Sequence, residues 1–187
     1  MEALANSGGP DSTCLLFLLN RYLKGDDANG SHSDGRPQRL VSLGIDHNLQ
    51  PTSSQMAQRA AKTAELLGVE HITTKIPWGK TGYYARPGAH DKIEESARTM
   101  RYKILFGNML DLQSNTLAMG HHLDDQIETM LMRLGRGAGL YGLAGMRPCR
   151  RWGMGNEFFT GIEGLRRWIV RPLLPISKVR HSLPQSA

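Results

Sequence analysis

The stretch that most constrains the fold is LANSGGPDSTCLLFLL, residues 4–19, where a short apolar run enters a glycine-rich turn and then an apolar helical pattern. Gly8 and Gly9 lack a Cβ, so the backbone there can adopt a positive φ and approach an anion closely. The N–H groups of the turn and of the first helical turn are free donors, and the helix dipole strengthens their attraction for an anion. The layout is typical of a phosphate-binding loop, although such a glycine turn also serves as an ordinary connection between a strand and a helix.

Polar side chains within the loop add to this pattern. Ser7 and Ser12 supply hydroxyl donors, and Asp11 is suited either to capping the helix or to holding a magnesium ion that bridges phosphates. No Lys-Ser or Lys-Thr pair follows the second glycine, and the spacing is not GxGxxG, which excludes the usual GTPase and dinucleotide-binding loops. Asn6 fits less well, because an apolar residue would pack better at the end of a buried strand.

Strand and helix patterns alternate along the rest of the chain. This alternation predicts an α/β fold, a doubly wound and mostly parallel sheet with helices on both faces and ligands at the carboxyl ends of the strands. There is no internal repeat and no sign of a second domain, so we expect one domain over residues 1–187. Further strands are predicted at residues 40–45, 71–78, 116–119 and 168–174, helices at 53–67, 92–112 and 124–136, and loops at 25–38 and 79–90.

Composition excludes several classes of protein. Of the 187 residues, 40% are hydrophobic and 21% are charged, which indicates a globular chain. No apolar run approaches the ~20 residues that span a bilayer, and the first residues already form a strand rather than a cleavable signal. The net charge of +6 gives weak support for a polyanionic partner. Cys14 and Cys149 are too few for a zinc cluster or a disulfide scaffold, and Cys14, within an apolar helical pattern, is expected to be buried.

A second motif, GHHLDDQIETMLMRLGRGAGLYGLAGM, follows the fourth predicted strand, at residues 120–146. Asp124 and Glu128 share a helix face, and Asp125 lies beside Glu128. These acids could simply stabilise the N-terminus of the helix, or they could bind a metal together with the two preceding histidines. The pattern by itself leaves both interpretations open.

The end of this motif is basic and rich in glycine. Neither helix capping nor metal ligation explains this tail, RLGRGAGLYGLAGM. Arg133 and Arg136 are suited to following a phosphate backbone, while the glycines permit close approach. The motif therefore combines acidic groups with a stretch suited to a nucleic acid.

Five blocks together are similar to the tRNA(Ile)-lysidine synthetases, in the order and spacing of that family. They are SGGPDS at Ser7, IDHNL at Ile45, ESARTMRY at Glu95, the motif at Gly120 and RPLL at Arg171. The first block resembles the PP-loop of the ATP pyrophosphatases, whose fold is like that of the adenine nucleotide alpha hydrolases. The resemblance covers nearly the entire chain but only the family's N-terminal catalytic domain, so the family's C-terminal tRNA-binding domains are absent from this sequence.

The resemblance implies an enzyme that uses ATP and Mg²⁺ to modify a tRNA. Family members adenylate the C2 oxygen of the wobble cytidine of a tRNA(Ile) with a CAU anticodon, and the side-chain amine of L-lysine then displaces AMP. The partners implied are this tRNA, lysine, and either a second copy of the chain or a protein that supplies tRNA-binding domains. We expect a soluble, intracellular protein without membrane contact, in the cytoplasm or, in a eukaryote, in mitochondria.

The resemblance also implies roles for the loop and for two following blocks. Asp46 is expected at the reacting centre, binding magnesium together with Asp11 or binding the lysine ammonium, unless it merely caps the following turn. Arg98 is expected to be catalytic and Arg101 to contact tRNA, since both could hold phosphates; they could instead pair with the neighbouring glutamates. The ATP-binding residues implied are Ser7, Gly8, Gly9, Pro10, Asp11 and Ser12.

The remaining roles fall in the second motif. His122, Asp125 and Glu128 are assigned to the reacting centre, while His121 is expected to be a structural neighbour of the strand end. Lysine must lose a proton to become a nucleophile, and either Glu128 or Asp125 is expected to accept it. Arg133 and Arg136 are expected to bind tRNA.

Two other interpretations remain. Another PP-loop enzyme acting on tRNA, such as a cytidine 2-thiolase, is disfavoured because such enzymes generally carry paired cysteines. GMP and asparagine synthetases share the loop but lack the HHLDDQIET block. From a different class, the chain could be an inactive nucleotide-binding or tRNA-binding module.

Overall fold

The apolar run before the glycine-rich loop forms the centre of the fold. In the computed structural model, which describes residues 1–24, 39–88, 93–137, 144–155 and 158–178, this run is strand β1 (Glu2–Ala5). Side chains alternate along a strand, so Ala3 and Leu4 face opposite sides of the sheet, and both are fully buried in separate hydrophobic clusters. A strand that is apolar on both faces requires helices on both sides.

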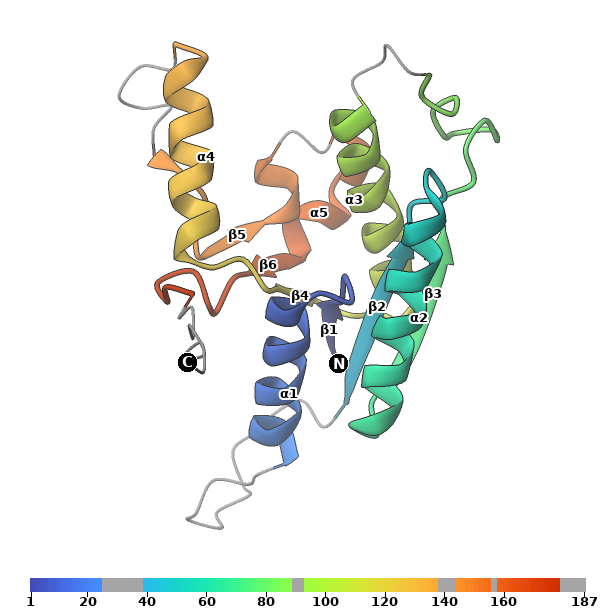
Figure 1. Ribbon diagram of the computed structural model, residues 1–187, viewed down its shortest axis with the longest axis vertical. Helices are drawn as coiled ribbons and strands as arrows, with labels where there is room; N and C mark the ends of the chain where they lie inside the picture. Colours follow the sequence, from blue (N-terminus) through green and yellow to red (C-terminus); the bar gives the residue numbers. More distant parts are fainter. Residues whose placement is uncertain (25–38, 89–92, 138–143, 156–157, 179–187) are drawn as a thin grey trace, which may run out of the picture.

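Six described strands form one sheet in the order β3-β2-β1-β4-β6-β5 (Figure 1). Neighbouring strands run parallel except for the edge pair β5 and β6, which is antiparallel. The strands besides β1 are β2 (Leu40–Asp46), β3 (Glu70–Lys75), β4 (Thr116–Met119), β5 (Cys149–Arg151) and β6 (Trp168–Val170). The helices are α1 (Pro10–Lys24), α2 (Pro51–Leu66), α3 (Ile93–Asp111), α4 (Leu123–Gly135) and α5 (Glu163–Arg166), and single 3-10 turns lie at η2 (Trp152–Met154) and η3 (Phe158–Thr160).

Helices cover both faces of the sheet, as the sequence predicted. On one face Leu105 and Met109 of α3 pack on the strands together with Trp152, whose ring is fully buried. On the other face the buried residues Leu16 of α1 and Ala64 of α2 pack on β1 and its neighbours. The structure therefore confirms the doubly wound, mostly parallel α/β fold.

The strand order places a ligand site beside β1. From β1 the chain adds β2 and β3 on one side, and then crosses to add β4 on the other side. In such sheets the connections that leave adjacent strands in opposite directions open a crevice at the carboxyl ends of those strands. Here the crevice lies between the loop after β1 and the segment after β4, which are the two motifs of the sequence.

Several predicted boundaries need correction. The last strand ends at Val170, four residues before the predicted end, because Pro172 has no N–H to donate and the chain turns there. The third strand likewise ends at Lys75 rather than at residue 78. Strand β5 was not predicted. The predicted loop at residues 25–38 lies outside the described residues.

The prediction that Cys14 is buried is wrong, since the residue is exposed on α1. Leu15 and Leu16 fill the core instead, while Phe17 and Leu18 are exposed. Helix α1 carries apolar residues around most of its circumference, so periodicity could not identify its inner face. No helix among the described residues is long and apolar enough to cross a membrane.

Candidate active site

Asn6 organises the glycine-rich loop. Its buried side chain lies at the carboxyl end of β1, where Oδ1 accepts hydrogen bonds from the Gly8 N–H at 3.0 Å and from the Ser12 hydroxyl at 3.2 Å. Its Nδ2 donates to the Ser42 hydroxyl on β2 at 3.1 Å. The expectation that an apolar residue would pack better here is therefore wrong, because the amide connects the loop, the first turn of α1 and the neighbouring strand.

Two glycines allow other elements to approach this loop closely. Gly8 has a φ of 75°, and a Cβ on it would lie 2.3 Å from the Met56 carbonyl oxygen of α2. Gly120, which follows β4, abuts the first turn of α1, where a Cβ would lie 3.0 Å from the Ser12 nitrogen. Ser7 and Ser12 bring their hydroxyl oxygens within 3.1 Å of each other. The loop is thus held from several sides with its donors grouped at the N-terminus of α1.

A cavity of about 410 Å³ opens beside this loop. Its wall includes the loop residues Asn6, Ser7, Asp11 and Ser12, residues of β2 and α2, and Gly120 and His121 after β4. Helix α1 begins at Pro10, which has no N–H, and the Thr13 N–H donates to the Gly9 carbonyl at 3.1 Å, so the N–H groups of Asp11 and Ser12 are those that lack a partner within the helix. A cavity with such donors on one side suits a ligand that carries phosphate.

Arg101 of α3 supplies a positive charge to this cavity. Its Nε is buried and has no hydrogen-bond partner among the described residues, and its guanidinium lies 5.7 Å from the centre of the Tyr102 ring. Burial lowers the pKa of Arg101, and the nearby Arg98 lowers it further. Burying a cation without an anionic partner is costly, so an unpaired guanidinium in a cavity wall indicates an anionic ligand. Arg98 is exposed, with its guanidinium 5.2 Å from the centre of the same ring, and does not line this cavity.

His121 lies in the cavity wall in its neutral form. Burial lowers the pKa of His121 to about 4, and the positive charge of Arg171 contributes. The Arg171 Nε donates a hydrogen bond to His121 Nδ1 at 3.2 Å, so the ring proton resides on Nε2. The sequence interpretation treated His121 only as a neighbour of the strand end, whereas the structure makes it a fixed donor group of the cavity wall.

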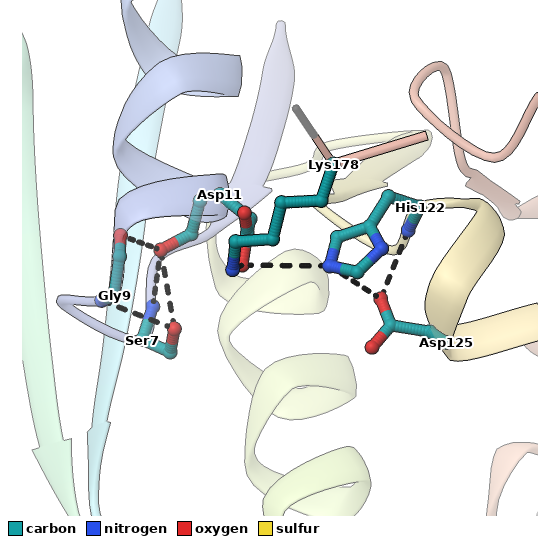
Figure 2. Close-up of polar contacts among 7 residues, drawn as sticks. Ser7, Gly9, Asp11, His122, Asp125 and Lys178 are labelled. Carbon is teal, nitrogen blue, oxygen red and sulfur yellow. Dashed lines mark hydrogen bonds and ion pairs between the residues drawn. The ribbon is translucent and has the colours of Figure 1, made fainter. Parts of the chain in front are cut away.

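Figure 2 shows how the two motifs meet. His122, the residue before α4, places Nε2 3.7 Å from the Asp11 carboxylate of the loop and 3.5 Å from the Asp125 carboxylate. The His122 N–H donates to Asp125 Oδ2 at 2.9 Å, which holds the start of α4. Lys178 reaches Asp11 Oδ2 at 3.1 Å from the other end of the chain. Acidic and basic groups from three distant segments thus surround the N-terminus of α1.

Asp46 has a different environment from the one expected. Its carboxylate is buried, with Oδ1 accepting from the Asn48 N–H at 2.8 Å and Oδ2 accepting from the Ser54 hydroxyl at 2.9 Å. These contacts are those of a turn cap before α2. Asp46 does not line the cavity, whereas the adjacent His47 does. Its role in binding magnesium or lysine stays a prediction.

Helix α4 carries the remaining predicted residues. It stands beside the β5 and β6 edge of the sheet (Figure 1), and none of its residues is buried in the described structure. Glu128 is exposed one turn beyond Asp125. Arg133 donates to the Gly145 carbonyl at 3.1 Å, and Arg136 is exposed at the end of the helix. Residues 138–143 of the glycine-rich tail lie outside the described residues.

Three groups in or beside the site were missed by sequence reasoning. Asn6 was judged a poor fit, His47 was not considered, and Lys178 lies 167 residues from its partner. Within the described part of the chain the buried Nδ1 of His47 has no hydrogen-bond partner, and burial lowers the pKa of this histidine. For Asn6 the signal was available, because a polar residue at the end of an otherwise buried strand needs partners.

The donor set at the loop fits a magnesium ion bound together with phosphate. Mg²⁺ is usually bound by one or two carboxylates, substrate phosphates and water. Asp11 supplies a partly exposed carboxylate beside the free N–H groups of α1. Across the part of the chain that the structure describes, no three or more His, Cys, Asp and Glu side chains are grouped to hold a metal by themselves.

Comparison with known proteins agrees with this arrangement. Curated relatives named tRNA(Ile)-lysidine synthase include one from Bradyrhizobium sp., 36% identical over 95% of this chain and 42% of its own length. The relative from Dehalococcoides mccartyi is 35% identical over 94% of this chain and 33% of its own length. The relative from Bacillus subtilis is 33% identical over 92% of this chain and 31% of its own length. The chain thus spans less than half the length of these relatives.

A solved structure and a family match identify the fold. The structure of the U34-tRNA thiolase NcsA from Methanococcus maripaludis, with its 4Fe-4S cluster, superposes with a TM-score of 0.67. It covers 95% of this chain and 53% of the thiolase at 20% identity, a likeness that concerns the fold alone. Residues 2–182 match the PP-loop domain family, which confirms the resemblance found in the sequence. With its loop, strand order and cavity in agreement, the chain belongs to the PP-loop domain family and is related to the tRNA(Ile)-lysidine synthases.

Proposed function

We propose that this chain carries the catalytic site for joining L-lysine to C2 of the wobble cytidine of a tRNA(Ile) with a CAU anticodon. In the first step the cytidine O2 attacks the α-phosphorus of ATP, and pyrophosphate leaves. In the second step the lysine side-chain amine attacks C2, loses a proton, and AMP leaves. The observation that supports this most is the meeting of the two motifs, where His122 lies 3.7 Å from Asp11 beside the cavity.

ATP binding is assigned to the loop and the cavity. The N–H groups at the start of α1 and the hydroxyls of Ser7 and Ser12 would bind phosphate oxygens, with Arg101 as a further cation. Asp11 would hold Mg²⁺, which supplies charge neutralisation for the leaving pyrophosphate. Donors that are already in place stabilise the developing charge without reorganising during the reaction.

The proton from lysine is assigned to one of two carboxylates of α4. Asp125 already accepts the His122 N–H at 2.9 Å, so its carboxylate is engaged in holding the start of α4. The exposed side chain of Glu128 makes no hydrogen bond or ion pair with another described residue, so its carboxylate can bind an ammonium group. We therefore assign the base to Glu128, with Asp125 ordering the helix start. The variant Glu128→Gln should lose lysine transfer and keep tRNA adenylation, and equal loss of both steps would contradict this assignment.

The tRNA substrate is assigned to the basic side of α4. Exposed Arg136 and partly buried Arg133 would contact the phosphate backbone, next to the acids that act on lysine. Other tRNA contacts, including those of a second copy or of additional domains, belong to the same proposal. A protein acting on tRNA would work in the cytoplasm, or in mitochondria in a eukaryotic cell.

The proposal is tested by measuring pyrophosphate release from ATP by the purified chain with Mg²⁺, lysine and the tRNA. The negative variant is Asp11→Ala, and its matched control is Asp111→Ala, an exposed aspartate at the end of α3. A second control uses a tRNA that carries uridine in place of the wobble cytidine. We expect release that requires the cytidine tRNA, with lysine recovered in that tRNA, and loss of both in Asp11→Ala but not in Asp111→Ala.

Other outcomes separate the alternatives. ATP binding without tRNA-dependent release would contradict catalysis by this chain alone and favour a nucleotide-binding module. Release that depends on a sulfur donor rather than lysine would favour the thiolase alternative. Salt-sensitive tRNA binding by itself would not distinguish them, because any basic surface releases counterions.

A further inference from the structure

The phosphate site has few positive charges of its own. Residues 7–12 contain one charged side chain, the negative Asp11. Among the described residues that line the cavity, only Arg101 carries a permanent positive charge. Helix N–H groups contribute partial charges, but a triphosphate is strongly anionic, and phosphate sites generally add Lys or Arg. A further protein cation close to the start of α1 would strengthen phosphate binding beyond what Arg101 and a magnesium ion supply.

Lys178 lies at this position because the segment after β6 is fixed. Arg171 is buried, donates to the Arg147 carbonyl at 2.8 Å and accepts from the Leu174 N–H at 3.2 Å through its own carbonyl. The Ile176 carbonyl then accepts from the N–H of the first residue of α4 at 2.9 Å. The segment thus runs past the start of α4 and delivers the ammonium of Lys178 to Asp11, at 3.1 Å (Figure 2).

The contact between Lys178 and Asp11 contributes little to stability. The two side chains are 43% and 33% exposed, and exposed ion pairs typically contribute only about 0–1 kcal/mol. The pair also occupies the carboxylate that suits a magnesium ion. A weak pair at the edge of a phosphate site can exchange partners when a ligand arrives.

We propose that Lys178 is a cation of the polyphosphate site, which binds the β- and γ-phosphates of ATP and hence the pyrophosphate that leaves. On binding, its ammonium moves from Asp11 to the phosphate oxygens, and the Asp11 carboxylate becomes free. This inference rests on the ATP-binding half of the proposed function and is independent of the tRNA reaction. It assigns to the segment after β6 a task that the lysine of a Walker loop performs within the loop itself.

The test is the affinity of the chain for ATP, pyrophosphate and AMP, each with Mg²⁺, measured by calorimetry. We expect Lys178→Ala to lower the affinity for ATP and for pyrophosphate about tenfold, which corresponds to the loss of one charge-assisted hydrogen bond. The affinity for AMP should be unchanged. Lys178→Arg should restore most of the affinity. The matched control is Lys62→Ala, an exposed lysine on α2, which should leave all three affinities unchanged.

A second pair of variants distinguishes phosphate binding from a role confined to Asp11. If Lys178 only positions Asp11, then Lys178→Ala should have no further effect in an Asp11→Asn background. Contact with phosphate predicts the same loss of pyrophosphate affinity in both backgrounds. Unchanged affinities for ATP and pyrophosphate in Lys178→Ala, or an affinity for AMP that falls as much as the other two, would each overturn the inference.

Failure of the proposed function would look different. A parent chain that binds pyrophosphate through Lys178 but forms no lysidine would keep this inference and refute catalysis by this chain. If the parent chain forms lysidine and Lys178→Ala binds pyrophosphate as tightly as the parent, the proposed function is kept and the inference about Lys178 is refuted. Absence of any ATP or pyrophosphate binding by the folded parent would overturn both.

Discussion

The substitution Asn6→Leu tests the most unexpected feature of the loop. Leucine has nearly the shape of asparagine and is the kind of residue that an ordinary buried strand end would carry. In the structure it would remove the acceptor of the Gly8 N–H and of the Ser12 hydroxyl, and the donor to the Ser42 hydroxyl and to the Ala60 carbonyl. The two hydroxyls have other partners, whereas the Gly8 N–H is buried and has no other partner among the described contacts.

The expected cost follows from these contacts. One buried donor left without a partner costs about 1–3 kcal/mol, and each of the other three lost hydrogen bonds costs about 0.5–1.5 kcal/mol. The added apolar side chain offsets part of this, so we expect a net loss of about 2–3 kcal/mol. In a protein of this size that corresponds to a fall in Tm of roughly 4–12 °C. ATP affinity should fall as well, because the loop is no longer held in its binding conformation.

The assay is thermal unfolding followed by calorimetric titration with ATP. Asn115→Leu serves as the control, since Asn115 is exposed immediately before β4 and its side chain makes no described hydrogen bond. A surface change of this kind should alter stability by no more than about 0.5 kcal/mol. If Asn6→Leu equals the parent in both Tm and ATP affinity, apolar packing dominates at this position and the role assigned to the amide is refuted.

Three further predictions concern the cavity wall. Gly120→Ala should weaken ATP binding, since its Cβ would press on the first turn of α1, whereas Gly107→Ala, which has open space and lies within α3, should keep the affinity and raise Tm. Arg101→Met should weaken ATP binding severalfold while Tm stays the same or rises, because it removes a buried guanidinium whose Nε has no partner; a clear fall in Tm would contradict this. The pKa of His121 is about 4 when folded and near 6.5 when unfolded, so its contribution to stability is complete above pH 6.5 and is lost as the pH falls toward 4. Urea unfolding at pH 7 and pH 5 should show a loss, bounded at about 3 kcal/mol over the whole range, that is smaller in His121→Gln.

The sequence predicted those parts of the fold in which local pattern and tertiary environment agree. The apolar runs of β1, β2 and β4 and the glycine turn before α1 defined the sheet and the position of the phosphate loop. Strand β5 was missed because Cys149–Arg151 has no apolar alternation and exists only through its pairing with β6. The last strand was predicted too long because its apolar pattern continues past Pro172, where pairing stops.

The site was predicted in part for similar reasons. Motifs identified the loop and the segment after β4, and the fold brings them together. The environment of Asp46 could not be predicted, since its partners Asn48 and Ser54 depend on the geometry of the turn into α2. Lys178 carries no local signal at all, because only the path of the segment after β6 brings it to the loop.

The central position of β1 also has a consequence for how the protein folds. Residues 2–5 pair with residues 40–43 on one side and with residues 116–119 on the other. Until β4 has docked, β1 presents an open edge, and the loop that follows it lacks the contact with Gly120. Long-range parallel pairing of this kind makes folding slow and leaves intermediates prone to aggregation. We therefore expect the yield of native protein to depend more on expression temperature and chaperone supply than on the stability of the final fold.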